Sequence, residues 1–330
     1  MNKKRSNIFK RIYHGSALER FLVFYFHTTP IIRLFYNQSV NNNVIYIYIC
    51  GVGRIVRCGL CDRLRSMVNM YESAKELGVK YKIAHFQPFD IYNYLKPNEV
   101  DWRITQDQIL YDLRLVQVNR IHAERYNYLW LPKKAYERAV RKGKLQIHIY
   151  GNPERIGDDA AKFSKSFHEL FKPSDELLKL VNINKSQIGG EYVSVTTRFQ
   201  NLLGDFYEGE TYKVLETEEE KLSYINSCIA KIEEIHQKHP DKKILVTSDS
   251  QRFLETAKEL PFVHVNPGKL VHLAYSTNAD YDVHMKSFVD LFTIADAQKV
   301  YLLKTGKMYK SKFAYTAAMI NQREYEVIEF

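Results

Sequence analysis

The feature that most constrains the fold of this chain is the run Val44-Ile-Tyr-Ile-Tyr-Ile-Cys50, which is apolar throughout and rich in β-branched residues. Such runs are typical of strands buried on both faces, as in the centre of a parallel sheet. Apolar residues recur at helical spacing over 62–77, and Gly78 supplies a stop signal. A second strand is predicted at 81–85. The pattern therefore predicts a strand–helix–strand unit of an α/β fold.

Strand and helix patterns continue to alternate along the chain. Further strands are predicted at 109–116, 145–150, 192–198, 244–247, 262–265 and 300–304, and helices at 217–237, 251–260, 287–295 and 311–320. The stretch 153–190 is polar and helical and ends at Gly189-Gly190, where we place a domain boundary. We expect two doubly wound, Rossmann-like domains, residues 44–190 and 191–330, that face a cleft. Ligands of such sheets bind at the carboxyl ends of the strands.

Residues 1–43 form a separate basic, amphipathic segment. Their charged residues are almost all cationic and are interleaved with Phe, Ile and Leu. This composition suits peripheral contact with an anionic membrane surface. The alternative is a helix packed on the body of the protein with a basic outer face. No apolar run is long enough to span a bilayer, and no small-residue cleavage site follows, so we expect neither a membrane span nor a removed signal peptide.

The net charge indicates which kind of binding partner to expect, and the cysteine content indicates the cellular compartment. The formal net charge of +10 favours an anionic partner: a nucleotide phosphate, a nucleic acid or an acidic membrane. No nucleic-acid-binding motif is present and the positive charge is spread along the chain, so a nucleic acid is not the expected partner. The 4 cysteines are too few for a disulfide framework and indicate a reducing, cytoplasmic compartment.

Two short motifs have metal or redox spacing. Cys58-Gly-Leu-Cys61 matches a redox pair or half of a zinc site, but the sequence has no second pair of ligands at comparable spacing. Asp280-Tyr-Asp282 imitates the metal-binding Asp-x-Asp of many glycosyltransferases, but it lies late in the chain and directly after a predicted loop. We therefore predict no metal site.

The first candidate anion site lies where the first strand passes into the first helix. Arg63 and Arg65 fall in the opening helical turn, where the helix dipole disfavours cations. A phosphate bound by backbone N–H groups and these guanidiniums would compensate. Asp62 as a helix cap, with both arginines solvated, is the alternative.

Two strand ends in the second half carry the other candidates. Arg198 ends the strand 192–198, well placed either to bind a diphosphate or to form a surface ion pair. The next strand ends in Val246-Thr-Ser-Asp249-Ser250, in which Asp249 can bind a ribose or base and a serine can cap the following helix.

Together these motifs resemble the fucosyltransferase-like GT-B glycosyltransferases, a group that includes α-1,6-fucosyltransferases, the nodulation-factor fucosyltransferase and protein O-fucosyltransferases. The group's strand-end signature is His-x-Arg-Arg. Arg198 occupies the place of its essential first arginine, whereas Thr196 replaces the histidine and Phe199 replaces the second arginine. Its Thr-Asp-Asp turn resembles Thr247-Ser-Asp249-Ser250, with one carboxylate lost.

The third signature of the group, a Ser-Ser segment, resembles the region of Asp290 and Ser311. The segments 86–90 and 95–102 resemble those of Bacteroides-type surface-polysaccharide relatives. The resemblance runs in chain order over residues 44–325.

This resemblance implies a metal-independent, inverting transferase that moves L-fucose from GDP-fucose to a hydroxyl of a glycan or lipid-linked acceptor, with residues 191–330 on the donor side and 44–190 on the acceptor side. Arg198, Arg63 and Arg65 would neutralise the leaving diphosphate. The other implied donor-binding residues are Asp62, Thr196, Asp249, Ser250, Asp290 and Ser311. Asp205 and Glu208 are the nearest candidates for a catalytic base.

A second interpretation belongs to another class of protein. Replacement of the reactive partners at Thr196 and Phe199 is compatible with a non-catalytic protein of the same fold that binds a nucleotide sugar or a glycan. Hydrolysis of the donor would distinguish an enzyme from such a binding protein. A nucleic-acid-binding protein would instead show affinity that falls steeply with salt.

Overall fold

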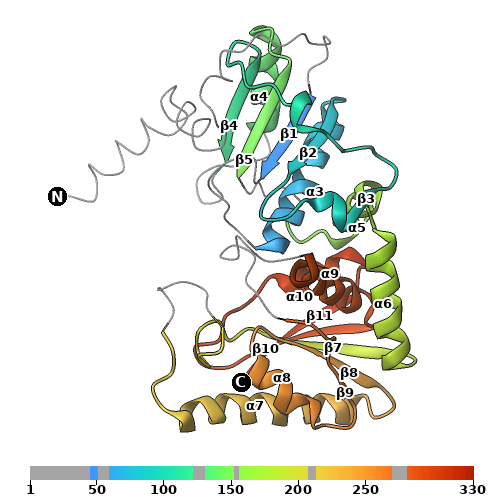
Figure 1. Ribbon diagram of the computed structural model, residues 1–330, viewed down its shortest axis with the longest axis vertical. Coiled ribbons are helices and arrows are strands. Elements are labelled where there is room, and N and C mark those ends of the chain that lie inside the picture. Colours follow the sequence, from blue (N-terminus) through green and yellow to red (C-terminus); the bar gives the residue numbers. More distant parts are fainter. Residues whose placement is uncertain (1–44, 51–58, 122–130, 152–155, 207–212, 270–280) are drawn as a thin grey trace, which may run out of the picture. The chain divides into compact units, whose positions relative to one another are not determined.

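The computed structural model describes residues 45–50, 59–121, 131–151, 156–206, 213–269 and 281–330, and these form two units (Figure 1). Unit 1 comprises the described residues of 1–58, 62–92 and 97–158, and unit 2 comprises those of 59–61, 93–96 and 159–330. The sequence placed the domain boundary near residue 190. The contacts group residues 159–190 with unit 2, because the helices in this stretch pack against helices near the C-terminus.

Unit 1 contains a four-stranded parallel sheet with the order β2-β1-β5-β4. Its strands and helices are β1 (Ile45–Cys50), α3 (Leu60–Glu76), β2 (Lys80–His85), β4 (Val116–Ile121), α4 (Leu131–Arg141) and β5 (Gln146–Gly151). Residues 46–49 of β1 are at most 3% exposed, which confirms the predicted doubly buried central strand. The predicted helix and the strands at 81–85 and 145–150 are confirmed to within a few residues.

The predicted strand at 109–116 is wrong, since 109–115 is irregular and β4 begins only at Val116. The reason is a turn at Asp112. Its carboxylate accepts a hydrogen bond from the Arg114 amide at 2.8 Å, and its carbonyl accepts one from Leu115 at 2.9 Å. Side-chain-to-backbone bonds of this kind compete with strand pairing. The apolar residues of this stretch, with Ile104, instead cover one face of the sheet beside Ile47.

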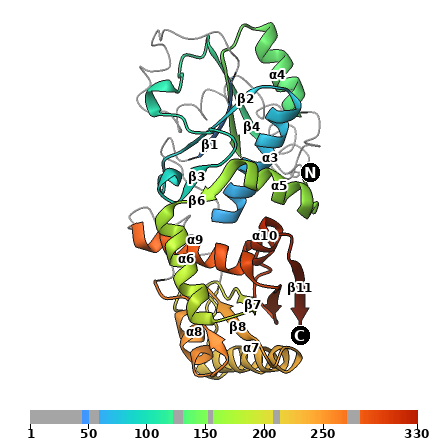
Figure 2. The ribbon, with the colours of Figure 1, turned by 90° about the vertical axis from the view of Figure 1, so that its right-hand side faces the viewer.

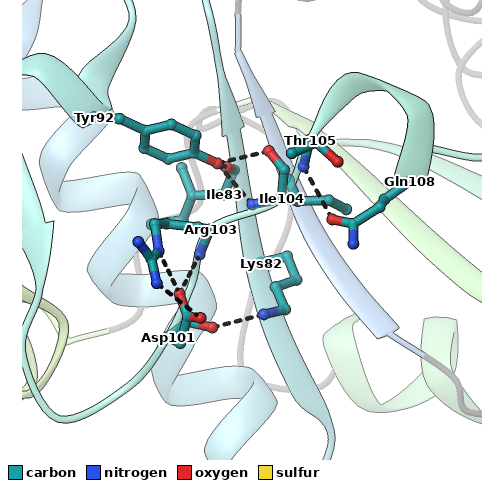
Figure 3. Close-up of polar contacts among 8 residues, drawn as sticks. All are labelled: Lys82, Ile83, Tyr92, Asp101, Arg103, Ile104, Thr105 and Gln108. Atoms are coloured by element: carbon teal, nitrogen blue, oxygen red, sulfur yellow. Dashed lines mark hydrogen bonds and ion pairs between the residues drawn. The ribbon is translucent and has the colours of Figure 1, made fainter.

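Tyr92 and residues 101–104 cover the edge strand β2 (Figure 3). The Tyr92 hydroxyl lies 3.0 Å from the Ile83 carbonyl and 2.8 Å from the Ile104 carbonyl, and it accepts a hydrogen bond from the Ile104 amide at 2.7 Å. Burial is the main cause that raises the pKa of Tyr92 to about 12. A covered edge is protected against pairing with another chain.

Unit 2 contains a five-stranded parallel sheet with the order β11-β10-β7-β8-β9. Its strands are β7 (Tyr192–Thr197), β8 (Lys243–Thr247), β9 (Val263–His264), β10 (Lys299–Lys304) and β11 (Glu324–Glu329). Its helices are α5 (Ala160–Leu170), α6 (Asp175–Ile188), α7 (Glu218–Lys238), α8 (Gln251–Lys258), α9 (Tyr281–Asp296) and α10 (Phe313–Ile320). The short strands β3 (Leu95–Pro97) and β6 (Phe171–Pro173) form a separate pair.

The two faces of the unit 2 sheet carry different helical layers (Figures 1 and 2). Val193 and Val195 of β7 belong to a core that includes Ile225 of α7 and Phe253 of α8. On the other face, the Tyr192 hydroxyl donates to the Thr293 carbonyl of α9 at 2.7 Å. The strand is therefore buried on both sides, as expected of a doubly wound sheet.

Three details of unit 2 differ from the sequence prediction. Helix α9 begins at Tyr281 and not at 287, so Asp282 lies in its first turn, whereas Asp280 lies outside the described residues. The apolar spacing over 217–237 predicts that Leu222 lies on the buried face of α7, but Leu222 is 45% exposed. Strand β11 was not predicted, because glutamates at alternate positions give it a polar composition. These glutamates pair with lysines, as Glu326 does with Lys299 at 2.7 Å.

A prediction about pH follows from His148 in the centre of β5. Burial lowers the pKa of this imidazole from 6.5 to about 3, so on acidification the unfolded chain takes up a proton before the folded one does. Stability that is present above pH 6.5 is lost as the pH falls toward 3, by up to about 1.4 kcal/mol per pH unit. His148→Leu should flatten the dependence in this window, measured by urea unfolding. Parallel curves for the two proteins would contradict this.

Candidate functional site

The candidate site lies at the carboxyl ends of the unit 2 strands. From β7 the chain continues to β8 on one side, whereas β10 pairs with β7 on the other, so the strand order reverses between β7 and β10. Such a switch point is where open α/β sheets bind their ligands. Arg198 directly follows β7, and the segment 305–311 follows β10. The topology therefore brings these two parts of the chain to one edge of the sheet.

Arg198 is held on two sides. Its Nε lies 3.3 Å from Oδ2 of Asp249, and its guanidinium carbon lies 5.0 Å from the centre of the Phe206 ring. The Arg198 side chain is 18% exposed and that of Asp249 only 3%. A guanidinium fixed by a carboxylate and an aromatic face is oriented before a ligand arrives, and it can give paired hydrogen bonds to an anion.

Asp249 also fixes the backbone that follows β7. Its two carboxylate oxygens accept hydrogen bonds from the amides of Phe199 at 2.8 Å and Gln200 at 2.7 Å. Gln200 has a φ of 56°, so the turn uses the left-handed region that disfavours side chains. Burial raises the pKa of Asp249, against the opposing effect of the Arg198 guanidinium and these amides. The carboxylate thus determines both the turn and the direction of Arg198.

Hydroxyl groups link the carboxyl ends of β7 and β8. The Oγ1 atoms of Thr196 and Thr247 are 2.8 Å apart, and Thr197 donates to Ser248 at 2.8 Å. Thr196 is 4% exposed, so the side chain at the position of the histidine in the resembled signature is engaged in a contact within the sheet.

Ser250 and Asp205 both act at the N-terminus of α8. The Ser250 hydroxyl accepts from the Phe253 amide at 3.1 Å and donates to Oδ2 of Asp205 at 2.8 Å. The same Oδ2 accepts from the Arg252 amide at 2.9 Å. This confirms the serine cap predicted for the helix. It also gives Asp205, a candidate base, a structural role as a second cap.

Ser311 reaches the same edge of the sheet through the loop after β10. The amide of Tyr309 donates to the Arg198 carbonyl at 3.0 Å, which joins the β10 loop to the end of β7. Ser311 follows two residues later, and its Oγ accepts from the amide of Phe313, the first residue of α10, at 3.1 Å. Ser311 thus lies at a helix N-terminus, where anions are stabilised.

Asp290 belongs to a different buried cluster, on α9. Its carboxylate oxygens each lie 2.5 Å from the Lys286 ammonium, one turn earlier in the helix, and Oδ1 accepts from Asn266 at 2.9 Å. Lys286 is 6% exposed. A charge buried with a paired partner is costly to uncouple. The sequence singled out Asp290 but not the lysine beside it.

The three candidates of the first half lie in α3 of unit 1: Asp62, Arg63 and Arg65. Arg63 is fully buried, and its Nη1 lies 3.1 Å from Nε2 of His85 and donates to the Gln87 carbonyl at 3.3 Å. Arg65 is 9% exposed. Arg63 therefore has a structural role within unit 1, while anion binding by this pair stays a prediction. Glu208 lies outside the described residues.

The metal, redox and membrane predictions can be compared with the described part of the chain only. Among those residues no three His, Cys, Asp or Glu side chains gather as metal ligands would. Cys61 is buried, and its predicted partner Cys58 lies outside the described residues. Within the same part of the chain, no helix combines the length and apolar character that a membrane span requires.

The fold is that of the fucosyltransferase-like GT-B glycosyltransferases, as the sequence resemblance predicted. A GDP complex of an Arabidopsis thaliana FUT1 variant is similar, with 9% identity, a TM-score of 0.52 and coverage of 95% of this chain and 75% of the other. The fucosyltransferase NodZ from Bradyrhizobium is similar with 13% identity and a TM-score of 0.52, and the match covers 88% of this chain and 96% of NodZ. Apo POFUT1 is similar with 11% identity and a TM-score of 0.53, and the match covers 89% of this chain and 99% of POFUT1. POFUT1 in complex with GDP-fucose gives a TM-score of 0.50.

No protein-family profile matches this chain, and no curated protein sequence matches it. The similarity to these solved structures therefore rests on the fold.

The sequence missed two residues that support predicted site residues. Phe206 supports Arg198, and Lys286 pairs with Asp290. A lysine four residues before an aspartate is a signal for the second, but the predicted helix began at 287 and left Lys286 outside it. The first had no local signal, because Phe206 lies in irregular chain.

We expect Asp249→Ala to lower the free energy of unfolding by about 3 kcal/mol or more, since it removes the partner of a mostly buried guanidinium and of two amides. Asp205→Ala is the control, because it removes only cap contacts and should cost about 1 kcal/mol. Urea unfolding measures both. Equal losses in the two variants would show that Asp249 has no special role in the turn.

Proposed function

We propose that this chain is a glycosyltransferase that binds a nucleotide-sugar donor, GDP-fucose, at the carboxyl edge of the unit 2 sheet. The observation that carries the proposal is Arg198 at the switch point, oriented by Asp249 and Phe206. A planar guanidinium in such a position suits a diphosphate. Support also comes from the fold, which is similar to structures described as complexes with GDP and GDP-fucose.

In the proposed reaction a nucleoside diphosphate leaves the anomeric carbon as an acceptor hydroxyl attacks from the opposite face. Arg198 stabilises the negative charge that develops on the diphosphate, and Ser311 at the start of α10 adds a hydrogen bond. The protein carries out this step without a metal. Arg63 and Arg65 of unit 1 remain proposed contributors, with unit 1 on the acceptor side.

Asp249 orients the donor in this proposal by holding Arg198. The hydroxyls of Thr196 and Ser250 are engaged within the sheet and at the N-terminus of α8, and Asp290 pairs with Lys286 on α9, which disfavours direct donor contacts for these three predicted residues. Asp205 already accepts two hydrogen bonds at α8, which disfavours it as a base. Glu208 is therefore the preferred candidate to take the proton from the acceptor hydroxyl. The acceptor itself is a glycan or a lipid-linked sugar of surface polysaccharide synthesis.

A non-catalytic protein that binds a nucleotide sugar or glycan is the second candidate, and one observation favours it. Phe199, in the place of the second arginine, is fully buried and packs against Phe253 with ring centres 5.1 Å apart. A second cation is therefore missing from this position. Such a protein would bind the donor but would not hydrolyse or transfer it.

We expect GDP to raise the melting temperature of the protein, and Arg198→Ala to remove most of this shift. Arg198→Lys should also lose most of the GDP-induced shift, because the point charge of an ammonium does not replace the paired hydrogen bonds of a planar guanidinium. Arg323→Ala is the matched control, since its Nε donates to the Ala295 carbonyl at 3.2 Å and it lies outside the candidate site. An unchanged GDP shift in Arg198→Ala would refute the assignment.

Release of GDP from GDP-fucose, measured in EDTA with and without glycan acceptors, distinguishes the two candidates. Turnover that Arg198→Ala abolishes supports the transferase, whereas binding without turnover supports the binding protein. Loss of turnover in EDTA with rescue by Mn²⁺ would contradict metal independence.

We also propose that residues 1–40 attach the protein peripherally to the inner, cytoplasmic face of a membrane, where a lipid-linked acceptor would lie. Each cation near an anionic surface contributes about 1 kcal/mol, and the apolar side chains add an insertion contribution. Full-length protein should therefore sediment with anionic liposomes at low salt, and a variant lacking residues 1–40 should not. Equal behaviour of the two forms would exclude the attachment.

A further inference from the structure

The loop after β10 is fixed to three other parts of unit 2. The Thr305 hydroxyl donates to the Phe330 carbonyl at 2.5 Å, the Lys307 amide donates to the Tyr224 hydroxyl at 3.0 Å, and the Tyr309 amide donates to the Arg198 carbonyl at 3.0 Å. The last of these contacts reaches the candidate site directly. The position of the loop therefore bears on the position of Arg198.

One face of α7 supports the middle of this loop. Tyr224 and Cys228 are four residues apart, so they lie on the same side of the helix. Tyr224 accepts the Lys307 amide, and Sγ of Cys228 lies 3.8 Å from Sδ of Met308, which is 3% exposed. The helix thus holds two successive loop positions, and the next residue in the chain is Tyr309, which contacts Arg198.

Gly306 shows how closely Tyr224 approaches the loop. Its φ is 50°, and a Cβ added there would lie 2.3 Å from the Tyr224 oxygen. A side chain there would force Tyr224 to shift, so this position favours glycine for two reasons: its conformation and the hydroxyl beside it. The Tyr224 hydroxyl is therefore a close and specific contact of the loop.

We propose that Tyr224 is a positioning residue, which sets Arg198 for the diphosphate through the loop 305–309. In this proposal Tyr224 acts through the loop and not by direct contact with the donor. The Tyr224 hydroxyl fixes the Lys307 amide. The next residue, the buried Met308, keeps the loop in that position, and the Tyr309 amide after it holds the carbonyl of Arg198. The inference about ligand binding rests on the proposed function, whereas the coupling from Tyr224 to Tyr309 does not.

Tyr224→Phe tests the proposal, because it removes only the hydroxyl. Tyr192→Phe is the matched control: it also removes a hydrogen bond of a tyrosine hydroxyl, at the opposite end of β7 from Arg198. Amide hydrogen exchange resolved at Tyr309 is measured without ligand, and the affinity for GDP is measured by calorimetry. Thermal unfolding of both variants reports any general loss of stability.

We expect Tyr224→Phe to speed exchange at Tyr309 and to weaken GDP binding, each by about fivefold, as loss of one hydrogen bond would give. Tyr192→Phe should leave both values unchanged even where it lowers the melting temperature. Unchanged exchange at Tyr309 in Tyr224→Phe, or equal effects of the two variants on GDP affinity, would overturn the positioning role.

The two proposals fail in different ways. If the wild-type protein does not bind GDP, the proposed donor site is wrong, and faster exchange at Tyr309 in Tyr224→Phe would still support the coupling through the loop. If the wild-type protein binds GDP and Tyr224→Phe binds it equally well, the donor site stands and the role of Tyr224 is refuted.

Discussion

The contact between Asp249 and the turn after β7 is the interaction on which the rest of the candidate site depends. One buried carboxylate accepts the amides of Phe199 and Gln200 and also pairs with the guanidinium of Arg198. Burying a carboxylate is unfavourable, as the raised pKa of Asp249 indicates, and the three partners offset that cost. The same atoms thus stabilise the turn and aim the cation, so the fold and the site share one contact.

Parallel strand order explains how separate parts of the chain meet there. All described strands of the unit 2 sheet run in the same direction, so the ends of β7, β8 and β10 lie at one edge. That edge receives Arg198, Asp249 and the loop leading to Ser311. On the strand faces, apolar packing against α7 and α8 leaves little freedom, and the chemistry is confined to where the strands end.

The departures from the fucosyltransferase signatures have clear structural counterparts. Phe199 adds to the core where a second arginine would stand, and Thr196 bonds to Thr247 where a histidine would stand. Both replacements exchange a group that can face a ligand for one that stabilises the sheet. Of the residues that match the strand-end signature, Arg198 is therefore the one that still carries a positive charge. Its support by Asp249, Phe206 and the β10 loop is correspondingly more important.

The sequence by itself determined the α/β class, the buried strands and Arg198 at a strand end, because apolar periodicity and helix caps are local patterns that survive without tertiary context. It failed where local signals mislead: the apolar stretch 109–115 turns at Asp112, and the glutamates of β11 hide an edge strand. Only the tertiary structure decided that Arg63 bonds to His85, that Asn266 donates to Asp290, and that Tyr224 reaches the loop beside Arg198. Partners of that kind are set by how elements distant in sequence pack together, and no local pattern encodes those distances.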